Sequence, residues 1–147
     1  MRKLSLIAIV IMAAVSCNRT NPFLTEWNTP YGIPEFEAVQ GKHDVPAVEA
    51  GIRQQQSEID AIIANQDAPT FENVVEAYEC SGAILDRVVG VLFNLSETDG
   101  TESLQKIVEQ VLPMLSAHSD NIFMNPYFFK KVEVLYNDME NLGLNQE

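Results

Sequence analysis

Hydrophobic side chains recur at helical spacing through most of the chain after residue 44. The first such segment covers residues 45–65 and is apolar at Val45, Val48, Ile52, Ile59, Ile62 and Ile63. Asp44 can cap its free amides, and Pro46 suits its first turn. The run Gln54-Gln55-Gln56 interrupts the pattern, and we place most of it on the solvent-exposed face. We therefore predict a helix over residues 45–65.

A second helical pattern covers residues 70–95, after a break at residues 65–69 that contains Pro69. Thr70 is a suitable cap for its first turn. Its apolar stripe consists of Phe71, Val74, Val75, Tyr78, Leu85, Val88, Val89, Leu92 and Phe93. Gly82 lies on this stripe, where it can permit a close helix crossing. The pattern ends near Leu95, because residues 96–100 have the composition of a turn.

A third helix is predicted to start at Asp99 or Thr101. The spacing of Asp99 and Glu102 is that of a capping box. The apolar positions that follow are Leu104, Ile107, Val108, Val111, Leu112, Leu115 and Ile122. Pro113 falls inside this pattern, and the periodicity continues on both sides of it. We predict a kink at Pro113 and not an end of the helix.

A fourth helix is predicted to open at Asn125 and Pro126, a capping residue followed by a first-turn proline. Gly143 can close it. Its apolar positions are Tyr127, Phe128, Val132, Leu135, Tyr136, Met139 and Leu142. No strand-like alternation of useful length occurs in the sequence. The predicted fold is therefore all-α, with about four helices arranged as antiparallel hairpins or a bundle.

The start of the chain has the pattern of an export signal. Two basic residues, Arg2 and Lys3, precede an apolar run over residues 4–15, which is too short for a membrane-spanning helix of about 20 residues. Small residues at 14–16 then stand directly before Cys17. We predict that residues 1–16 are a lipoprotein signal peptide and that Cys17 is the lipid-bearing first residue. Ordinary secretion with cleavage after Ser16 is the alternative.

Residues 17–44 are predicted to form a lipid-anchored tether and an extended strap, ahead of a helical region at 45–147. Asn18 follows the cysteine, so the Asp that retains lipoproteins at the inner membrane is absent. We therefore expect the lipid to anchor the protein in the outer membrane, facing the periplasm. Several prolines exclude regular helix from residues 21–34. Apolar side chains at Phe23, Leu24, Trp27, Tyr31, Ile33 and Phe36 indicate a strap that packs on the helices.

Charge and cysteine content exclude several classes of function. Loss of residues 1–16 removes Arg2 and Lys3, which takes the formal net charge from −12 to −14. Such an acidic chain repels phosphates, so we expect no nucleic-acid partner, and the membrane is reached only through the lipid on Cys17. Acylation of Cys17 leaves Cys80 without a disulfide partner. We expect Cys80 to be a buried structural thiol.

Catalytic chemistry has few candidates in this sequence. His43 and His118 are its two histidines, and neither belongs to a His-Glu-x-x-His zinc motif. We expect His118 to be half-buried on a helix and His43 to be exposed. Glu72, Glu76 and Glu79 share one helical face, which is more typical of a solvated surface than of a metal site. We therefore assign no catalytic, cofactor-binding or metal-binding residue.

One cluster is a candidate interaction surface. The aromatic run Tyr127-Phe128-Phe129 precedes Lys130-Lys131 on the fourth predicted helix. Aromatic side chains beside cations are frequent at protein interfaces. Packing of these rings in the core is nevertheless the favoured interpretation.

Several ordered blocks of sequence resemble the N-terminal region of bacterial peptidyl-dipeptidases, also called dipeptidyl carboxypeptidases, of the thimet-oligopeptidase-like zinc metallopeptidase family. The resemblance extends over residues 21–147. The blocks are residues 21–24 (NPFL), 29–36 (TPYGIPEF), 46–53 (PAVEAGIR), 68–74 (APTFENV), 91–95 (VLFNL) and 115–121 (LSAHSDN).

This resemblance implies a mostly helical exported enzyme that removes C-terminal dipeptides from oligopeptides. The family's zinc site lies on a His-Glu-x-x-His motif far downstream of the region that this chain resembles. We therefore expect zinc in the parent enzyme, no zinc bound by this chain, and no activity of the 147-residue chain alone. The alternative is a small helical lipoprotein that binds peptide or a partner protein without catalysis. A third possibility is that the isolated region folds poorly, because its helices expose surfaces meant for the missing part.

Overall fold

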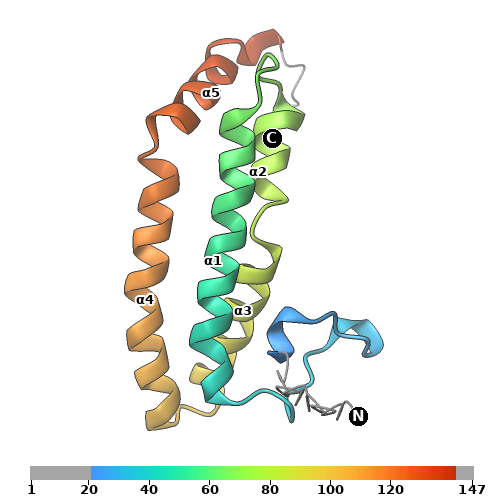
Figure 1. Ribbon diagram of the computed structural model, residues 1–147, viewed down its shortest axis with the longest axis vertical. Coiled ribbons are helices and arrows are strands. Elements are labelled where there is room, and N and C mark those ends of the chain that lie inside the picture. The colour runs from blue at the N-terminus through green and yellow to red at the C-terminus, as the bar shows by residue number, and fades with distance from the viewer. Residues whose placement is uncertain (1–20, 142–147) are drawn as a thin grey trace, which may run out of the picture.

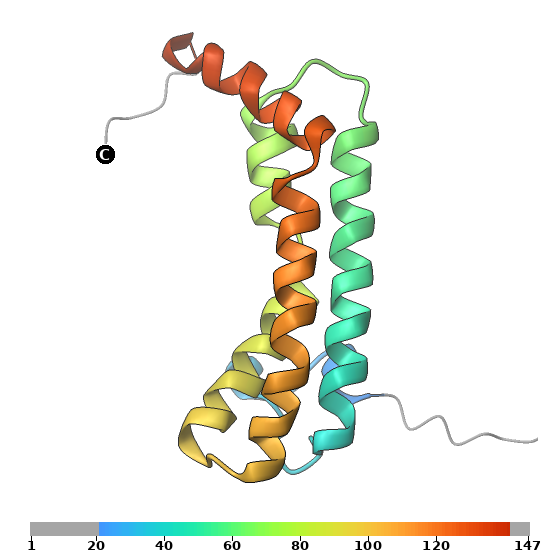
Figure 2. The same ribbon diagram turned by 90° about the vertical axis from the view of Figure 1, so that its left-hand side faces the viewer.

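Three helical segments lie side by side and alternate in direction in the computed structural model, which describes residues 21–141 (Figure 1). The first is α1 (Gly41–Ala64). The second is formed by η3 (Phe71–Glu76), α2 (Ala77–Glu79) and α3 (Ala83–Thr98), and the third is α4 (Glu102–Phe123). A further helix, α5 (Pro126–Asn137), crosses the upper end of the bundle (Figure 2). The predicted all-α fold of antiparallel helical hairpins is confirmed, and residues 21–141 contain no strand.

Helix α1 starts four residues before the predicted position. Gln40 is its N-cap residue, and the backbone N–H of Gln40 donates to Nδ1 of His43 at 3.0 Å. The prediction that Asp44 caps this helix is wrong, because Asp44 lies inside the first turn and is buried. His43 likewise belongs to the first turn of α1 and is only partly exposed, so its expected place in the strap is also wrong.

The second predicted helix begins where expected but is not continuous. The Thr70 hydroxyl accepts from the backbone N–H of Asn73 at 3.2 Å, and Oδ1 of Asn73 accepts from the N–H of Thr70 at 2.8 Å, which confirms Thr70 as the cap. The helix stops at Glu79, and α3 runs to Thr98, beyond the predicted end. Gly82 makes the break, because its φ of 76° is left-handed.

The close helix crossing is made by a different glycine. A Cβ atom placed on Gly51 would lie 2.8 Å from Cα of Leu85, so α1 and α3 meet with almost no space between their backbones. The predicted role of Gly82 in such a crossing is wrong. Its backbone N–H instead donates to Oε2 of Glu58 at 2.8 Å, which joins the break in the second segment to α1.

Thr101 is the N-cap of α4. Its hydroxyl accepts from the backbone N–H of Leu104 at 3.4 Å. The predicted capping box at Asp99 is therefore wrong, since Thr101 occupies the cap position. Helix α4 continues through Pro113, as predicted.

The start of α5 is also as predicted. Oδ1 of Asn125 accepts from the backbone N–H groups of Tyr127 and Phe128, at 2.9 and 3.3 Å, and Pro126 occupies the first turn. The helix ends at Asn137, before the predicted end, and a short 3-10 turn follows at Met139–Asn141. Gly143 lies outside the described residues.

Two hydrophobic clusters hold the helices together. The lower cluster joins η1, α1, α3 and α4, and its buried members are Phe23, Ala47, Val48, Leu85, Val88, Val91, Leu92 and Val111. The upper cluster joins α1, η3, α4 and α5 through Ile59, Ile62, Val74, Ile122, Phe128 and Leu135. Burial of these side chains supplies most of the driving force for the bundle.

The strap packs on the lower cluster through Phe23, Trp27 and Val39. It contains the short helices η1 (Pro22–Leu24) and η2 (Pro30–Gly32). Phe23 is fully buried, and its carbonyl accepts from Nη2 of Arg87 at 2.7 Å. The Arg87 guanidinium also lies over the ring of Trp27, 4.8 Å from its centroid. Tyr31 is 99% exposed, so the later aromatic residues do not pack as predicted.

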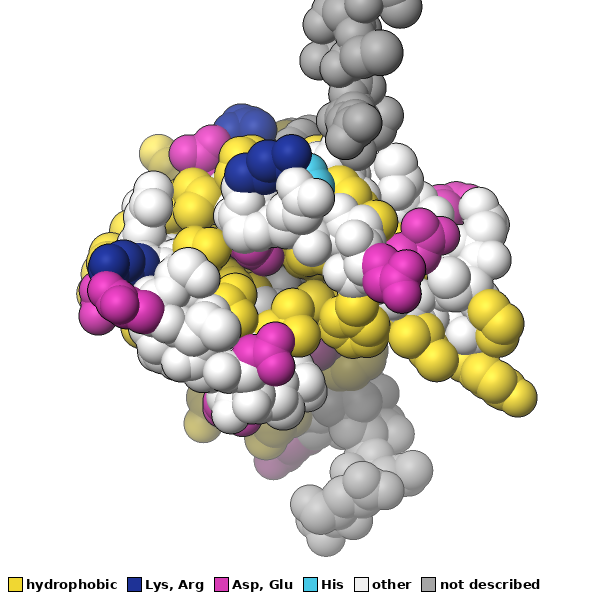
Figure 3. Space-filling model, turned by 90° about the horizontal axis from the view of Figure 1, so that it is seen from below, with side chains coloured by type: hydrophobic (Ala, Val, Ile, Leu, Met, Phe, Trp, Pro, Cys, Tyr) yellow, Lys and Arg dark blue, Asp and Glu magenta, His cyan; other side chains and the backbone are white. Residues whose placement is uncertain are grey.

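The lower end of the molecule shows hydrophobic side chains among acidic, basic and uncharged ones (Figure 3). Ile33 and Phe36 of the strap are each about half exposed. Within residues 21–141, no helix is both long enough and apolar enough to cross a membrane. The predicted signal peptide at residues 1–16 and the lipidation of Cys17 fall outside the described residues and stay predictions.

Candidate functional site

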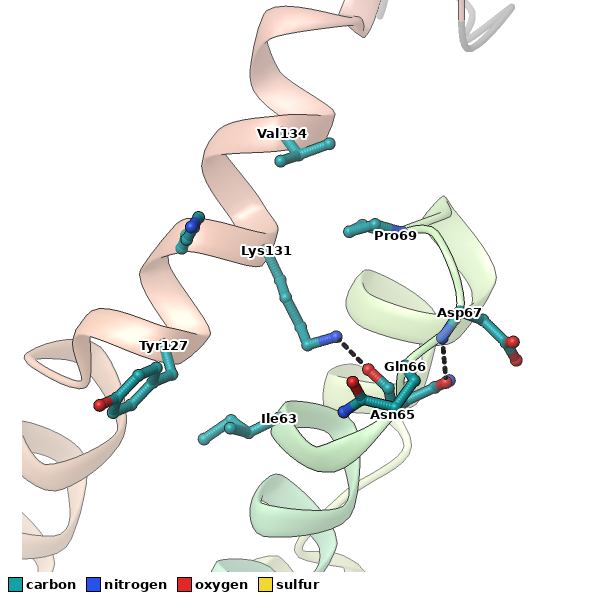
Figure 4. Close-up of a pocket in the computed structure, with 9 residues that line it drawn as sticks. Ile63, Asn65, Gln66, Asp67, Pro69, Tyr127, Lys131 and Val134 are labelled. Carbon is teal, nitrogen blue, oxygen red and sulfur yellow. Dashed lines mark hydrogen bonds between the residues drawn. The ribbon is translucent and has the colours of Figure 1, made fainter.

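A groove of about 510 Å³ lies between α5 and the turn that joins α1 to η3 (Figure 4). It is lined by Ile63, Asn65, Gln66, Asp67, Pro69, Tyr127, Lys130, Lys131 and Val134. The turn is shaped locally, because the backbone N–H of Asp67 donates to Oδ1 of Asn65 at 2.9 Å. Helix α5 forms the opposite wall.

Lys131 joins the two walls of this groove. Its Nζ donates to the backbone carbonyl of Asn65 at 2.7 Å (Figure 4). This contact satisfies a carbonyl just past the last turn of α1 and places a cation at the negative end of that helix. Lys131 is thus used to hold α5 against α1, whereas Lys130 is exposed at the groove.

The lining of the groove combines apolar and polar groups. Ile63, Pro69 and Val134 give it apolar contacts, and Tyr127 is 70% exposed at its edge. Backbone and side-chain amides of the 65–67 turn provide hydrogen-bonding groups. No histidine or cysteine lines it, so it holds no pair of the kind that activates a nucleophile.

The aromatic run on α5 is divided between the core and the surface. Phe128 is 6% exposed and belongs to the upper cluster. Tyr127 and Phe129 are exposed, so core packing holds for only one of the three rings. An α-helix separates successive side chains by about 100°, so neighbours in the sequence face different directions.

A buried polar network crosses the middle of the bundle. Nε2 of His118 donates to Oε1 of Gln55 at 2.8 Å, and Nε2 of Gln55 donates to the Ser81 hydroxyl at 3.3 Å. That hydroxyl donates to the carbonyl of Tyr78 at 2.6 Å. Burial lowers the pKa of His118, which favours the neutral ring. His118 is buried, beyond the predicted half-burial, and it fastens α4 to α1.

Asp44 is the one buried carboxylate among the described residues. It is 2% exposed, and its Oδ1 has no hydrogen-bond partner. Burial raises the pKa of Asp44 to about 6, against a smaller lowering from a hydrogen bond to its own backbone. It lies at the first turn of α1, at the opposite end of that helix from the groove, so the two features do not form one site.

Other residues singled out from the sequence do not form a metal centre. Glu72, Glu76 and Glu79 are exposed, and hydrogen bonds from its own backbone N–H and from Thr70 lower the pKa of Glu72. Desolvation, followed by the charge of Lys42, lowers the pKa of His43. Within residues 21–141, no three His, Cys, Asp or Glu side chains are placed to hold a metal ion together.

The environment of Cys80 is a further correction. The sequence predicts a buried thiol, but Cys80 is exposed. The helix stops one residue before it, so Cys80 lies in the turn that leads to Gly82. The periodicity that places it on the apolar stripe does not continue through that turn.

Comparison with known proteins relates this region to peptidases, although no family model matches the chain. A dipeptidyl carboxypeptidase of Salmonella typhimurium is 36% identical over 128 residues, which are 87% of this chain and 19% of the relative. The Escherichia coli dipeptidyl carboxypeptidase is 35% identical over 127 residues. The oligopeptidase A of Salmonella typhimurium is 27% identical over 100 residues, which are 68% of this chain and 14% of the relative.

The chain is an N-terminal region of this peptidase family. The resemblance predicted from the sequence blocks is confirmed. The chain spans about a fifth of the length of the dipeptidyl carboxypeptidases that it matches. The groove of Figure 4 and the buried network of His118 are therefore features of the N-terminal helices of a peptidase.

Sequence reasoning found one side of the groove, because Tyr127, Lys130 and Lys131 belong to the candidate interaction surface predicted on the fourth helix. It missed the facing turn and the buried network. The groove depends on where α5 crosses the end of α1, and no local pattern specifies that position. The position of Gln55 could have been predicted from its spacing. It lies four residues before Ile59 and three residues after Ile52, on the buried face of α1. Its place in a run of three glutamines hid that spacing.

Proposed function

We propose that this chain is the N-terminal helical part of an exported zinc peptidase that releases C-terminal dipeptides from oligopeptides. The supporting observation is the 36% identity to a dipeptidyl carboxypeptidase over 87% of the chain. The described helices form a scaffold with a groove of about 510 Å³ at one end, which we propose to contact peptide. In this proposal they shape one wall of the space in which the peptide is held.

The zinc ion of the proposed enzyme does not fit the described residues. No three side chains of the ligating types converge within residues 21–141, and each histidine has one ring nitrogen in a hydrogen bond within the bundle. In this proposal the zinc ligands belong to another part of the enzyme. We expect the 147-residue chain to bind zinc weakly and to leave peptides intact.

Purified full-length chain tests this expectation. Zinc binding to the chain is measured by calorimetric titration. A set of oligopeptides is then incubated with the chain in the presence of zinc, and the products are followed by mass spectrometry. We expect no stoichiometric tight zinc binding and no dipeptide product. Turnover that depends on the chain would overturn the assignment of catalysis to another part of the enzyme.

Peptide binding without catalysis is the second candidate, and the groove of Figure 4 favours it. The DNA downstream of the gene separates the two. A His-Glu-x-x-His motif in frame, or one frameshift away, supports the peptidase. An unrelated downstream gene together with peptide binding that is weakened by Tyr127→Ala supports the binding protein.

We also propose that Cys17 carries the lipid that holds the protein at the outer membrane, facing the periplasm. The support is the apolar run at residues 4–15 followed by small residues and this cysteine. Labelled palmitate is expected to enter the wild-type chain and not the Cys17→Ala variant. Equal labelling of both would overturn the proposal.

A further inference from the structure

The strap carries a group of hydrophobic side chains that the bundle leaves exposed. Tyr31 is 99% exposed, and Ile33 and Phe36 are 50% and 49% exposed. All three fall within residues 30–36 (PYGIPEF), at the end of the molecule opposite the groove of Figure 4. Figure 3 shows hydrophobic side chains projecting from one edge of this end. Exposed hydrophobic side chains that occur together mark a contact site, whereas single ones do not.

A strained turn holds Tyr31 in its exposed position. Its φ of 63° lies in the left-handed region, and within residues 21–141 no other residue except glycine has this conformation. The backbone N–H of Gly32 donates to the Thr29 carbonyl at 3.1 Å, and the Thr29 hydroxyl donates to the Ile33 carbonyl. Strain of this kind is concentrated at binding sites and switch regions. The turn therefore presents Tyr31 to the surroundings and does not fold it onto the helices.

The proposed lipid anchor is attached close to this surface. Asn21, the first described residue, is four positions after Cys17. Four residues of polypeptide span at most about 14 Å. Asn21 is itself fastened to α1, because its Nδ2 donates to the His43 carbonyl at 2.7 Å. A lipid on Cys17 therefore holds the strap at the surface of the bilayer.

We propose that Tyr31, Ile33 and Phe36 enter the interfacial layer of the lipid bilayer in which Cys17 is anchored. The inference rests on the proposed lipidation of Cys17. Tyrosine is favoured in this layer because its ring is apolar while its hydroxyl stays hydrated, and the other two side chains add apolar area. The contact lies near the start of α1 and the groove of Figure 4 at its end, and this helix of 24 residues is about 36 Å long. Such a contact leaves the groove free to face the periplasm.

The charges of the strap make this contact apolar and not electrostatic. Residues 21–42 contain three acidic side chains, Glu26, Glu35 and Glu37, and one basic side chain, Lys42. Anionic lipid headgroups repel such a surface, whereas a zwitterionic bilayer does not. The contact is therefore expected to persist at high salt concentration and to weaken when the fraction of anionic lipid rises.

Quenching of tryptophan fluorescence by a nitroxide-labelled lipid tests the inference. Trp27→Phe removes the only tryptophan of the sequence, and Tyr31→Trp then places one in the proposed contact. Ser57→Trp, at an exposed position of α1, is the matched control in the same background. Each chain is expressed with its own signal, purified from the cell envelope and reconstituted into phosphatidylcholine vesicles with and without the nitroxide-labelled lipid.

We expect the nitroxide to quench the tryptophan at position 31 at least about threefold more strongly than the tryptophan at position 57. Equal quenching at the two positions, or a difference that disappears at high salt concentration, would overturn the inference. A blue shift at position 31 that occurs without vesicles and grows with protein concentration would also overturn it, in favour of contact between two copies of the chain.

A second way of attaching the chain separates this inference from the lipidation of Cys17. If mass spectrometry finds no acyl chain on Cys17, the lipidation proposal fails. The same variants are then made with Cys80→Ser, because Cys80 is exposed, and are coupled through the Cys17 thiol to a maleimide lipid in the vesicles. Stronger quenching at position 31 than at position 57 supports the contact of the strap with the bilayer, and equal quenching overturns it.

Discussion

Nε2 of His118 lies 2.8 Å from Oε1 of Gln55 and joins the middle of α4 to the middle of α1. The same glutamine donates to Ser81 beside the break at Gly82. One side chain therefore connects all three antiparallel segments of the bundle. Polar groups buried in this way stabilise a structure only while every member keeps its partner.

Removal of Gln55 tests the importance of this network. Gln55→Leu keeps the approximate volume but leaves His118 and Ser81 without their partner. We expect the free energy of unfolding to fall by about 1–3 kcal/mol in urea titrations. Gln54→Leu, at an exposed neighbouring position, is the control and is expected to change it by less than about 0.5 kcal/mol. Equal effects of the two substitutions would contradict the network.

Asp44 predicts a dependence of stability on pH. Its pKa is about 6 in the folded chain, above its ordinary value of 3.8, so the folded state binds more protons between these values. Its contribution to stability therefore falls as pH rises from about 4 to 6 and is constant above that range. We expect Asp44→Asn to raise the free energy of unfolding at pH 7 by about 1–3 kcal/mol.

The control for this prediction is Asp60→Asn, at an exposed position of α1. It is expected to leave the pH dependence unchanged. The stability of both variants is compared with that of the wild-type chain by thermal unfolding between pH 4 and 8. If Asp44→Asn destabilises the chain at pH 7, the ionised carboxylate is stabilised by a favourable interaction in the folded state.

Two glycines are expected to respond to alanine in opposite directions. Gly82 has a φ of 76°, and a Cβ atom there would overlap with Gln55. Gly82→Ala is therefore expected to destabilise the chain by at least about 1–2 kcal/mol. Gly90 lies inside α3 with open space around it, so Gly90→Ala is expected to stabilise by about 0.5–1 kcal/mol. Denaturant unfolding that shows the same sign for both would contradict the break at Gly82.

The contact of Arg87 with the strap has a built-in reporter, because Trp27 is the only tryptophan in the sequence. Arg87→Met removes the donor to the Phe23 carbonyl and the cation over the Trp27 ring. We expect the tryptophan emission to shift to the red and its quenching by acrylamide to increase, with the helical circular dichroism unchanged. Arg53→Met, on the exposed face of α1, should leave the emission as it is.

The sequence predicted those parts of the fold that depend on neighbouring residues. Thr70 and Asn125 cap helices as expected, because each accepts hydrogen bonds from residues two or three positions ahead. The all-α class followed from apolar periodicity for the same reason. The peptidase family was identified from short ordered blocks, and the comparisons support it.

The wrong predictions concern residues whose conformation is decided by contacts with distant segments of the chain. Gly82 looked like a helix residue, and its left-handed turn is fixed by Glu58 on another helix. The exposure of Cys80 follows from that turn. The sequence pointed to the α5 side of the groove through Tyr127, Lys130 and Lys131, but the opposite wall was missed, since the groove is formed only where α5 crosses the end of α1.

Exchange of the matched region in a relative tests whether this chain is the N-terminal part of a dipeptidyl carboxypeptidase. The Escherichia coli dipeptidyl carboxypeptidase, with its 127 matched residues replaced by those of this chain, is assayed for release of C-terminal dipeptides from an oligopeptide. We expect turnover within about tenfold of the parent enzyme, and a much larger loss when the exchanged region also carries Gly51→Ala, which forces α1 away from Leu85. A soluble, fully helical chimera that releases no dipeptide would contradict the claim that this chain is the N-terminal part of such a peptidase.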